Sequence, residues 1–377
     1  MKIKVDKDNF LKKLVEANTM VSIKTLIPAN KYLYIKTMAE KNLLIFRGIN
    51  SETKSAITVI LDKVEISEDT LIGVEGALLE KIISKMPSGE LNIAIKDSGK
   101  TEKKLIVTND SLKLEMNTIS SEQMPDIEIK DDIVGTLVLE KDILLKEIEK
   151  ISFAVSKDIS RPILNGINFS LVDGKLKLAA LDGYRLAITS MDIVKNETEG
   201  FDFTVGNNFL KDVVKIFRKI ETKTIKLSFN KNKMMLQTKY LRLKTTLLSG
   251  EFVNYENIIK TSRDYKDNIK YNSKNMKDSL DRMAIIANRN NNALILKIVD
   301  NFIEIGTTSE TAVSKEKIKL IEKKENEMKI GVNVNYMMDV LKKVESEKVE
   351  MRYKNATSPL FIGEGSTEFL LVPIRLK

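Results

Sequence analysis

The chain repeats one order of segments three times, and this repeat limits the folds open to it. A segment at residues 5–14 returns at residues 139–148 and 271–280. A second segment, at residues 74–83, returns at residues 205–214 and 332–341. In both sets successive copies begin about 130 residues apart, so two independent segments share one spacing. The sequence therefore predicts three similar structural units in succession.

The repeated segments predict helices, and the stretches around them predict strands. In the first set, a polar residue able to cap a helix precedes apolar residues at helical spacing, as Asp6 does in the first copy. Alternation of apolar and polar residues predicts antiparallel strands, for example at residues 32–36, 91–95, 176–179, 225–229, 302–305 and 349–353. Asp173-Gly174 and Asp300-Asn301 predict hairpin turns. Each third is expected to hold two helices and roughly six to eight strands in an α+β fold, with the helices packed on antiparallel sheets.

The expected domain boundaries follow the same spacing. Met124-Pro125-Asp126 and Phe252-Val253-Asn254 stand at matching positions of the repeat. They divide the chain into three domains, at residues 1–127, 128–252 and 253–377.

The composition removes several classes of chemistry. Cysteine and histidine are both absent, which excludes disulfides, thiol nucleophiles, Cys/His zinc sites and Ser-His-Asp triads. No glycine-rich turn leads into a helix with Lys-Ser or Lys-Thr, as a phosphate-binding loop requires. Asp173 and Asp182 stand in ordinary Asp-Gly turn dipeptides. The sequence therefore indicates no active site, no metal and no cofactor.

The chain carries no sign of a membrane location. Its first eight residues are charged throughout and contain no apolar signal core. No uninterrupted apolar run approaches the length that spans a bilayer. A cytoplasmic protein with no membrane partner is expected.

The net charge of +9 has two interpretations. It favours a polyanionic partner, but lysine greatly outnumbers arginine, and AT-rich coding alone also produces such a composition. The repeated helices place cations on the faces opposite their apolar residues: Lys12, Lys81, Lys146, Lys211, Lys215, Arg218, Lys277 and Lys342. A solvated helix face is the plain interpretation of any one of them. The same sign on six related helices favours a basic strip that follows phosphates without reading bases, if the six helices line one surface.

Two further segments point to a binding surface. The first, at residues 181–187, is a polar Asp-Gly turn between apolar residues. The second, at residues 371–376, is an apolar run with a proline that ends one residue before the C-terminus. Chain ends usually fray unless they are docked. An apolar tail of this kind is therefore expected to form the wall of a groove.

These segments and the repeat resemble the bacterial sliding clamp, the beta subunit of the DNA polymerase III holoenzyme. The resemblance rests on Asp-Gly-Tyr-Arg-Leu-Ala at 182–187, Pro-Ile-Arg-Leu at 373–376, Arg161-Pro162-Ile163-Leu164-Asn165-Gly166 and residues 333–341, and it covers essentially the whole chain. It implies a head-to-tail homodimeric ring of six domains, in which twelve helices surround duplex DNA and sheets form the rim. It also implies a processivity factor without enzymatic activity, with the DNA polymerase III alpha subunit, the clamp loader and other clamp-motif proteins as partners.

The resemblance also implies site residues, position by position. The expected peptide groove, between the second and third domains, is lined by Leu164, Gly183, Tyr184, Arg185, Leu186, Val253, Asn257, Ile258, Asn333, Tyr336, Val372, Pro373, Ile374, Arg375 and Leu376. Arg185 and Arg375 are expected to orient polar groups of the peptide. Lys24 and Arg161 are added to the cations expected to face DNA, and Leu114 and Met116 are expected to meet Ile285 and Ile286 of a second copy. The chain departs from the family at Leu181, Tyr184, Val253 and Asn257, where Thr, His, Pro and Arg are common.

Two other functions stay open at this point. A nucleic-acid hydrolase based on carboxylates or lysine would need clustered acidic residues near the basic surface. A repeat scaffold that binds only proteins would make the charge incidental. Removal of Leu371–Lys377 separates the clamp from the scaffold, because it is expected to abolish polymerase binding and to leave DNA encirclement intact.

Overall fold

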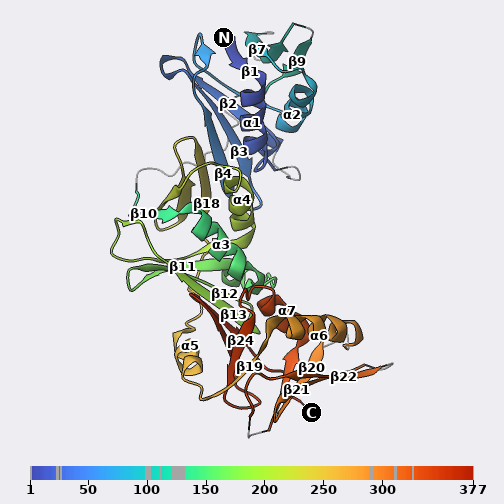
Figure 1. The fold of residues 1–377 in the computed structure, drawn as a ribbon. Coiled ribbons are helices and arrows are strands. Elements are labelled where there is room, and N and C mark those ends of the chain that lie inside the picture. The colour runs from blue at the N-terminus through green and yellow to red at the C-terminus, as the bar shows by residue number, and fades with distance from the viewer. Residues whose placement is uncertain are drawn as a thin grey trace. The chain divides into compact units, whose positions relative to one another are not determined.

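The computed structural model describes residues 2–22, 25, 28–97, 103–110, 112–120, 132–287, 292–309, 312–324 and 327–376. The chain forms two compact units (Figure 1). The first unit contains residues 1–145, 193–199 and 205–248, and the second contains residues 146–192, 200–204 and 249–377. The middle third of the sequence thus contributes to both units.

The first unit is built on two antiparallel sheets. A five-stranded sheet has the order β5-β1-β7-β8-β9, and a nine-stranded sheet has the order β14-β10-β16-β17-β18-β4-β3-β2-β6. The strands are β1 (Lys2–Asp6), β2 (Leu33–Met38), β3 (Leu43–Asn50), β4 (Ser55–Leu61), β5 (Glu65–Ile66), β6 (Thr70–Val74), β7 (Glu90–Asp97), β8 (Lys103–Thr108), β9 (Lys113–Asn117), β10 (Gly135–Glu140), β14 (Lys195–Asn196), β16 (Thr224–Phe229), β17 (Lys233–Gln237) and β18 (Leu241–Thr246). The nine-stranded sheet is continuous because β18 pairs with β4, with Leu241 opposite Val59.

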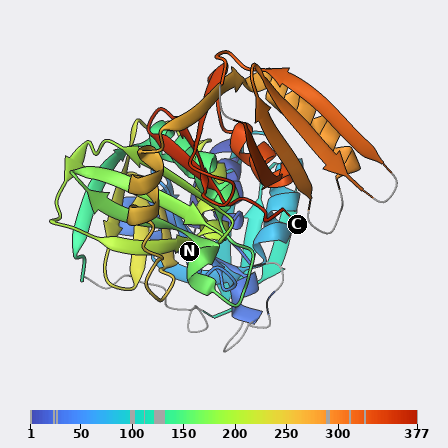
Figure 2. The same cartoon turned by 90° about the horizontal axis from the view of Figure 1, so that it is seen from below.

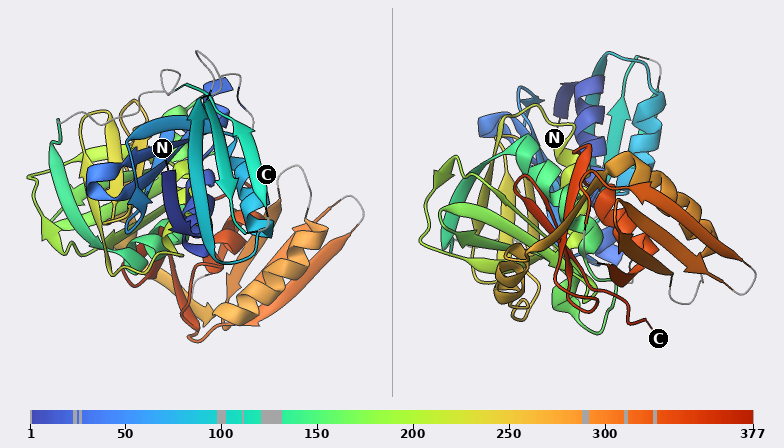
Figure 3. Two further views of the ribbon diagram at one scale, coloured as in Figure 1. Left: turned by 90° about the horizontal axis from the view of Figure 1, so that it is seen from above. Right: turned by 60° about the horizontal axis from the view of Figure 1, so that its bottom comes forward.

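The helices of the first unit are α1 (Lys7–Asn18), α2 (Gly76–Lys85) and α4 (Asn207–Phe217). Helices α1 and α2 lie side by side (Figure 3). Phe10 of α1 packs edge-on against Phe46 of β3, with ring centroids 5.3 Å apart, and both rings are fully buried. Burial of two such rings supplies several kcal/mol, about 2 for each side chain. This contact fixes which face of the nine-stranded sheet is covered.

The second unit also contains two antiparallel sheets. The eight-stranded sheet has the order β15-β11-β12-β13-β26-β25-β24-β19, and the four-stranded sheet has the order β22-β21-β20-β23. The strands are β11 (Gly166–Val172), β12 (Lys175–Leu181), β13 (Arg185–Met191), β15 (Asp202–Gly206), β19 (Asp267–Asn272), β20 (Ala293–Val299), β21 (Phe302–Thr308), β22 (Val313–Lys319), β23 (Met328–Asn333), β24 (Lys348–Tyr353), β25 (Leu360–Glu364) and β26 (Thr367–Leu371). Strands β13 and β26 join the middle and last thirds of the sequence, with Arg185 opposite Leu371.

The second unit has helices α5 (Glu256–Arg263), α6 (Ser273–Ile286) and α7 (Val334–Leu341), and α3 (Lys141–Ile151) has residues in both units. Helix α6 lies along the strands of the four-stranded sheet (Figure 2). Short 3-10 turns occur at Pro28–Lys31, Ala39–Lys41, Ser152–Ala154 and Pro162–Asn165. None of the described helices is both long and apolar enough to cross a membrane.

All six repeated segments form helices, as predicted. The carboxylate of Asp6 accepts from Asn9 N at 2.9 Å and caps α1, and Asn272 caps α6 in the same way. The predicted Asp173-Gly174 turn is present, with both residues at positive φ. Two expectations differ from the structure. In the residues that the structure describes, the last third holds an additional short helix, α5. The described parts of the first and middle thirds contain nine strands each, one above the expected range.

Candidate functional site

The turn at residues 182–185 is held by one carboxylate. Oδ1 of Asp182 accepts from the backbone N of Tyr184 at 2.9 Å and from that of Arg185 at 3.0 Å. Gly183 between them has φ +93°, which a residue with a Cβ adopts only with strain. The Asp-Gly dipeptide therefore serves geometry here, and it presents the Tyr184 side chain outward.

The Arg185 guanidinium donates hydrogen bonds to three groups of its own chain. These are Asp182 Oδ2 at 3.0 Å, Asp339 of α7 at 2.5 Å and the carbonyl of Phe153 at 2.9 Å. The side chain is only 10% exposed. This arrangement does not support the expectation that Arg185 orients polar groups of a peptide. Its geometry is that of a support that links the 182–185 turn to α7.

Two tyrosine rings, Tyr336 and Tyr184, extend from Arg185 toward the protein surface. The Arg185 guanidinium lies 4.5 Å from the ring centroid of Tyr336, and the Tyr336 ring lies 5.8 Å from that of Tyr184. Burial raises the pKa of Tyr336, with a further contribution from the nearby Asp182 carboxylate. Tyr184 is 59% exposed. The three side chains thus form a stack whose outer member faces solvent.

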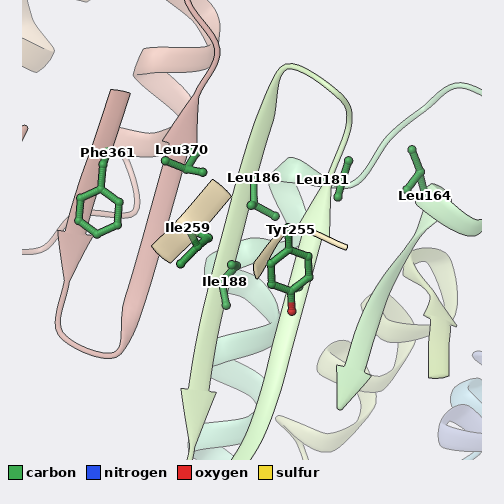
Figure 4. Close-up of a cluster of buried hydrophobic side chains, with 9 residues drawn as sticks. Leu164, Leu181, Leu186, Ile188, Tyr255, Ile259, Phe361 and Leu370 are labelled. Atoms are coloured by element: carbon green, nitrogen blue, oxygen red, sulfur yellow. The ribbon is translucent and has the colours of Figure 1, made fainter. Parts of the chain in front are cut away.

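A buried apolar cluster includes Leu181 and Leu186, which flank the 182–185 turn (Figure 4). It draws on the 3-10 turn Pro162–Asn165, on the strands next to the 182–185 turn, on α5 with its N-cap residue and on the last two strands. Its members are Leu164, Ala179, Leu181, Leu186, Ile188, Tyr255, Ile259, Phe361 and Leu370. Leu181, a departure from the family, belongs to this buried set. The two isoleucines of α5 differ in solvent exposure: Ile259 is buried in the cluster, and the neighbouring Ile258 is exposed.

The C-terminal tail is docked by backbone hydrogen bonds. Val372 N donates to Tyr184 O, and Ile374 N donates to Gly331 O of β23, each at 2.8 Å. A Cβ on Gly331 would lie 2.5 Å from the carbonyl oxygen of Ile374. The tail can therefore approach β23 only because residue 331 is glycine.

All of the expected groove residues belong to the second unit. Five of them, called the partner surface below, have exposed apolar side chains: Tyr184, Val253, Ile258, Val372 and Leu376. Leu164 and Leu186 are buried. Asn333 has a local role, since its side chain caps α7 by accepting from Asn335 N and Tyr336 N. Sequence reasoning missed Phe153, Gly331 and Asp339, which hold Arg185 and the tail.

The cations expected to face DNA differ in their surroundings. Lys24 lies outside the described residues. Lys146 pairs with Glu345 at 3.0 Å, and the half-buried Lys277 donates to the carbonyl of Val344. Arg161 lies beside Gly183, next to the partner surface. The remaining cations of this set are exposed, either on their helices or, for Arg218 and Lys342, at the C-caps: Lys12, Lys81, Lys211, Lys215, Arg218 and Lys342.

Helices α1 and α4 bring two groups of these cations together in the first unit. A hollow of about 340 Å³ lies between them, with an apolar floor that includes Leu11 and Ile216. Lys12, Lys215 and Lys219 line the same hollow. Cations from one copy of the repeat thus converge with cations from the next.

The residues expected at the dimer interface differ in how far their side chains are exposed to solvent. Ile285 on α6 is 85% exposed, and Ile286 is half-buried. Met116 of β9 is only 6% exposed, and Leu114 is half-buried. The Met116 side chain packs within its own protomer, so the available part of β9 is mainly its backbone edge. No group of three or more acidic residues in the described segments is placed to hold a metal ion.

Known proteins are similar to the chain along its whole length. Profiles for the DNA polymerase III beta subunit match residues 1–128 as its N-terminal domain, 138–254 as its central domain and 262–371 as its C-terminal domain. The beta sliding clamps of Staphylococcus epidermidis and Staphylococcus aureus are each 24% identical to the chain, over all of it and 99% of their own length.

Solved structures share the fold. The DNA polymerase III beta subunit of Pseudomonas aeruginosa superposes with a TM-score of 0.91 at 19% identity, and the sliding clamp of Bacillus subtilis superposes with a TM-score of 0.90 at 22% identity. Each match covers all of both chains. The chain therefore belongs to the DNA polymerase III beta subunit family, the bacterial DNA sliding clamps that serve replication as non-catalytic processivity factors.

Proposed function

We propose that two copies of the chain close head to tail into a ring around duplex DNA and tether the replicative polymerase through the partner surface. The match of all three family domains, in order, along residues 1–371 carries this proposal. A closed ring keeps the polymerase at high effective concentration near DNA while its contacts with DNA stay weak. The chain itself then needs no catalytic group.

Two unpaired strand edges support the head-to-tail contact. In the described sheets, β9 ends the five-stranded sheet and β22 ends the four-stranded sheet. An unpaired edge presents backbone donors and acceptors to another strand. Pairing of β9 with β22 of a second copy joins unlike surfaces, and such heterologous contacts form a ring when the rotation closes. Ile285, and to a lesser degree Leu114 and Ile286, would add apolar contacts to the backbone pairing.

The helix cations support weak and sequence-independent DNA contact. Lysine provides a charge for phosphates, and such contacts carry no base information. Helices α1 and α4 place Lys12, Lys215 and Lys219 around one hollow. Lys24, Arg161 and the other predicted cations remain part of the proposed DNA-facing set. Under this proposal the chain works in the cytoplasm on the chromosome.

The partner surface supports a peptide-mediated tether. The five residues of the partner surface, Tyr184 among them, have exposed apolar side chains, and they lie in the second unit together with a buried apolar cluster. Aromatic and aliphatic anchors of this kind dominate binding energy at interfaces. An extended segment of the polymerase alpha subunit, of the clamp loader or of another clamp-motif protein would place its apolar side chains here. The proposed domain boundaries, 1–127, 128–252 and 253–377, put this surface between the second and third domains.

Retention on circular DNA tests the ring. The protein is loaded onto a nicked circular plasmid, excess protein is removed by gel filtration at high salt, and the plasmid is then cut once. A sliding ring stays on the circle and leaves the linear product, whereas a protein held only by charge is lost from both at high salt. Sedimentation should give twice the 42.7 kDa chain mass. A monomer that is not retained on the circle would overturn the proposal.

A further inference from the structure

The outward face of the nine-stranded sheet in the first unit differs from the helix-covered face. Phe46 of β3 points toward α1, where it meets Phe10. Successive side chains of a strand point to opposite faces of a sheet. Arg47, the next residue, therefore lies on the face that α1 does not cover.

One cross-strand row on this face runs through all nine strands. From β6 to β14 its members are Gly73, Tyr34, Arg47, Thr58, Arg242, Gln237, Lys226, Val138 and Lys195, each directly opposite the next. Four of them are cations, and they stand on alternate strands. Strands lie close to 4.8 Å apart, so these cations follow one another at roughly 10 Å. No member of the row is acidic.

A hollow of about 200 Å³ opens at one end of this row. Its floor is apolar, from Ile45, Ile60 and Leu71, and its cations are Lys36, Arg47 and Arg242. Lys36 and Arg242 form no ion pair with any side chain in the described part of the chain. At the far end of the row the charge is neutralised, because Lys195 pairs with Glu197. The hollow therefore lies at the more positive end.

The chemistry of this cationic row favours an acidic peptide over a nucleic acid. Proteins that bind single strands present aromatic rings on which bases stack, but the one ring lining the hollow, Tyr34, is fully buried and donates its hydroxyl to Ala29 O. The hollow is smaller than an ordinary small-molecule pocket. It suits one apolar side chain flanked by carboxylates.

We propose that the cationic row and its hollow bind an extended acidic segment of a partner protein, with one apolar side chain seated on Ile45, Ile60 and Leu71. In an extended segment with the polyproline II conformation, every third residue returns to the same side and advances about 9 Å. Carboxylates at that spacing match the cations of the row. This site is separate from the partner surface around Tyr184, and the inference does not depend on that surface.

Fluorescence anisotropy with a defined probe tests this inference. The probe is a labelled nonapeptide of aspartate and glutamate with a central leucine, and it is titrated with the full-length protein at low ionic strength. Arg242→Glu and Lys36→Glu should each weaken binding about tenfold, because an exposed attraction becomes a repulsion. Lys85→Glu on α2 changes net charge equally at an exposed site and should have little effect, as should Tyr184→Ala. Replacing the central leucine of the probe by alanine should cost about tenfold.

Several results would overturn the inference. Equal weakening by Arg242→Glu and Lys85→Glu would show attraction to overall charge only. Failure of the probe to bind would exclude an available acidic-peptide site. If an oligothymidine binds more tightly than the peptide, and the same variants weaken its binding, the row is a nucleic-acid site instead. Arg242→Gln, with circular dichroism of each variant, separates loss of the charge from loss of the fold.

Discussion

The guanidinium of Arg185 lies 4.5 Å from the ring centroid of Tyr336, between the two carboxylates that it bridges, those of Asp182 and Asp339. These contacts join a turn of the middle third to a helix of the last third. A planar guanidinium can stack on a ring and donate to several acceptors at once, which an ammonium cannot. The position therefore requires arginine for its shape as well as its charge.

Arg185→Lys is expected to lower the free energy of unfolding by about 2 kcal/mol, because the lysine leaves acceptors of the turn and α7 unsatisfied. It should also weaken binding at the partner surface, since Tyr184 and Tyr336 lose their support. Denaturant unfolding and a polymerase pull-down measure the two effects. Arg375→Lys, in the exposed tail, is the matched control and should leave stability unchanged. Equal stability of both variants would contradict the supporting role.

Gly331→Ala is expected to displace the tail. The new Cβ would stand 2.5 Å from Ile374 O, and the hydrogen bond from Ile374 N to Gly331 O would be lost. We expect partner binding to fall about tenfold or more, with a change in global stability of about 1 kcal/mol. Gly306→Ala in the same four-stranded sheet is the control, because a Cβ there meets only ordinary contacts at 3.8 Å. Hydrogen exchange at Ile374 N reports the docking directly.

The helices were predictable because their signals are local. Asp6 and Asn272 stand beside the helices that they cap, and the apolar spacing lies within each segment. The long-range strand pairs were not predictable in this way. Leu241 lies opposite Val59 in a shared sheet, but nothing near either residue specifies its distant neighbour. The sequence thus predicts three repeats, whereas the strand pairing divides the middle repeat between two compact units.

The candidate site shows the same limit. The resemblance placed Tyr184 and the tail, and both lie at one surface in the structure. It did not identify Asp339 as the partner of Arg185, because these residues meet only after strands far apart in the sequence have paired. Leu114 and Met116 occupy equivalent positions in the alternating pattern of β9. This pattern does not show how deeply each side chain is buried. Depth of burial depends on what packs on the strand, which is a tertiary property.

Glu345→Gln is expected to strengthen contact with linear duplex DNA. Lys146 pairs with Glu345 at 3.0 Å, and hydrogen bonding to Lys146 holds the pKa of this glutamate below its usual value, so the pair is intact at neutral pH. The variant frees the lysine for one more phosphate, and the slope of log affinity against log salt should steepen by about 0.9. Glu322→Gln, which frees Lys270 of β19, controls for net charge. The same change in both variants would remove Lys146 from the DNA-facing set.

The pH dependence of stability should report the pair between Glu316 and Arg282. Two hydrogen bonds, at 2.7 and 2.8 Å, join Arg282 of α6 to Glu316 of the edge strand β22. Hydrogen bonding to Arg282 lowers the folded-state pKa of Glu316 from 4.5. A lowered carboxyl pKa contributes stability above the unfolded value, and this contribution is lost as pH falls through the folded value.

At neutral pH, Glu316→Gln should therefore be less stable than the natural chain by about 0.5–1 kcal/mol. The difference should vanish well below pH 4.5, because protonated Glu316 is then uncharged, as the glutamine is. Denaturant unfolding at the two pH values measures it. Glu304→Gln in the neighbouring strand β21 should show a smaller difference at neutral pH. A difference for Glu316→Gln that persists in acid would show that the pair does not titrate as described.

Deletion of residues 372–377 should separate tethering from encirclement. Leu371 is buried in β26 and lies opposite Arg185, so a cut that removes it would also damage the eight-stranded sheet. A cut after Leu371 removes only the docked tail, including the hydrogen bond from Val372 N to Tyr184 O. We expect the shortened chain to remain on nicked circular DNA as the full chain does, because the edges of β9 and β22 are intact. Polymerase binding should fall at least tenfold, since the tail supplies one side of the partner surface. Retained polymerase binding would move the tether away from the tail, whereas loss of both properties would show that the tail serves the fold.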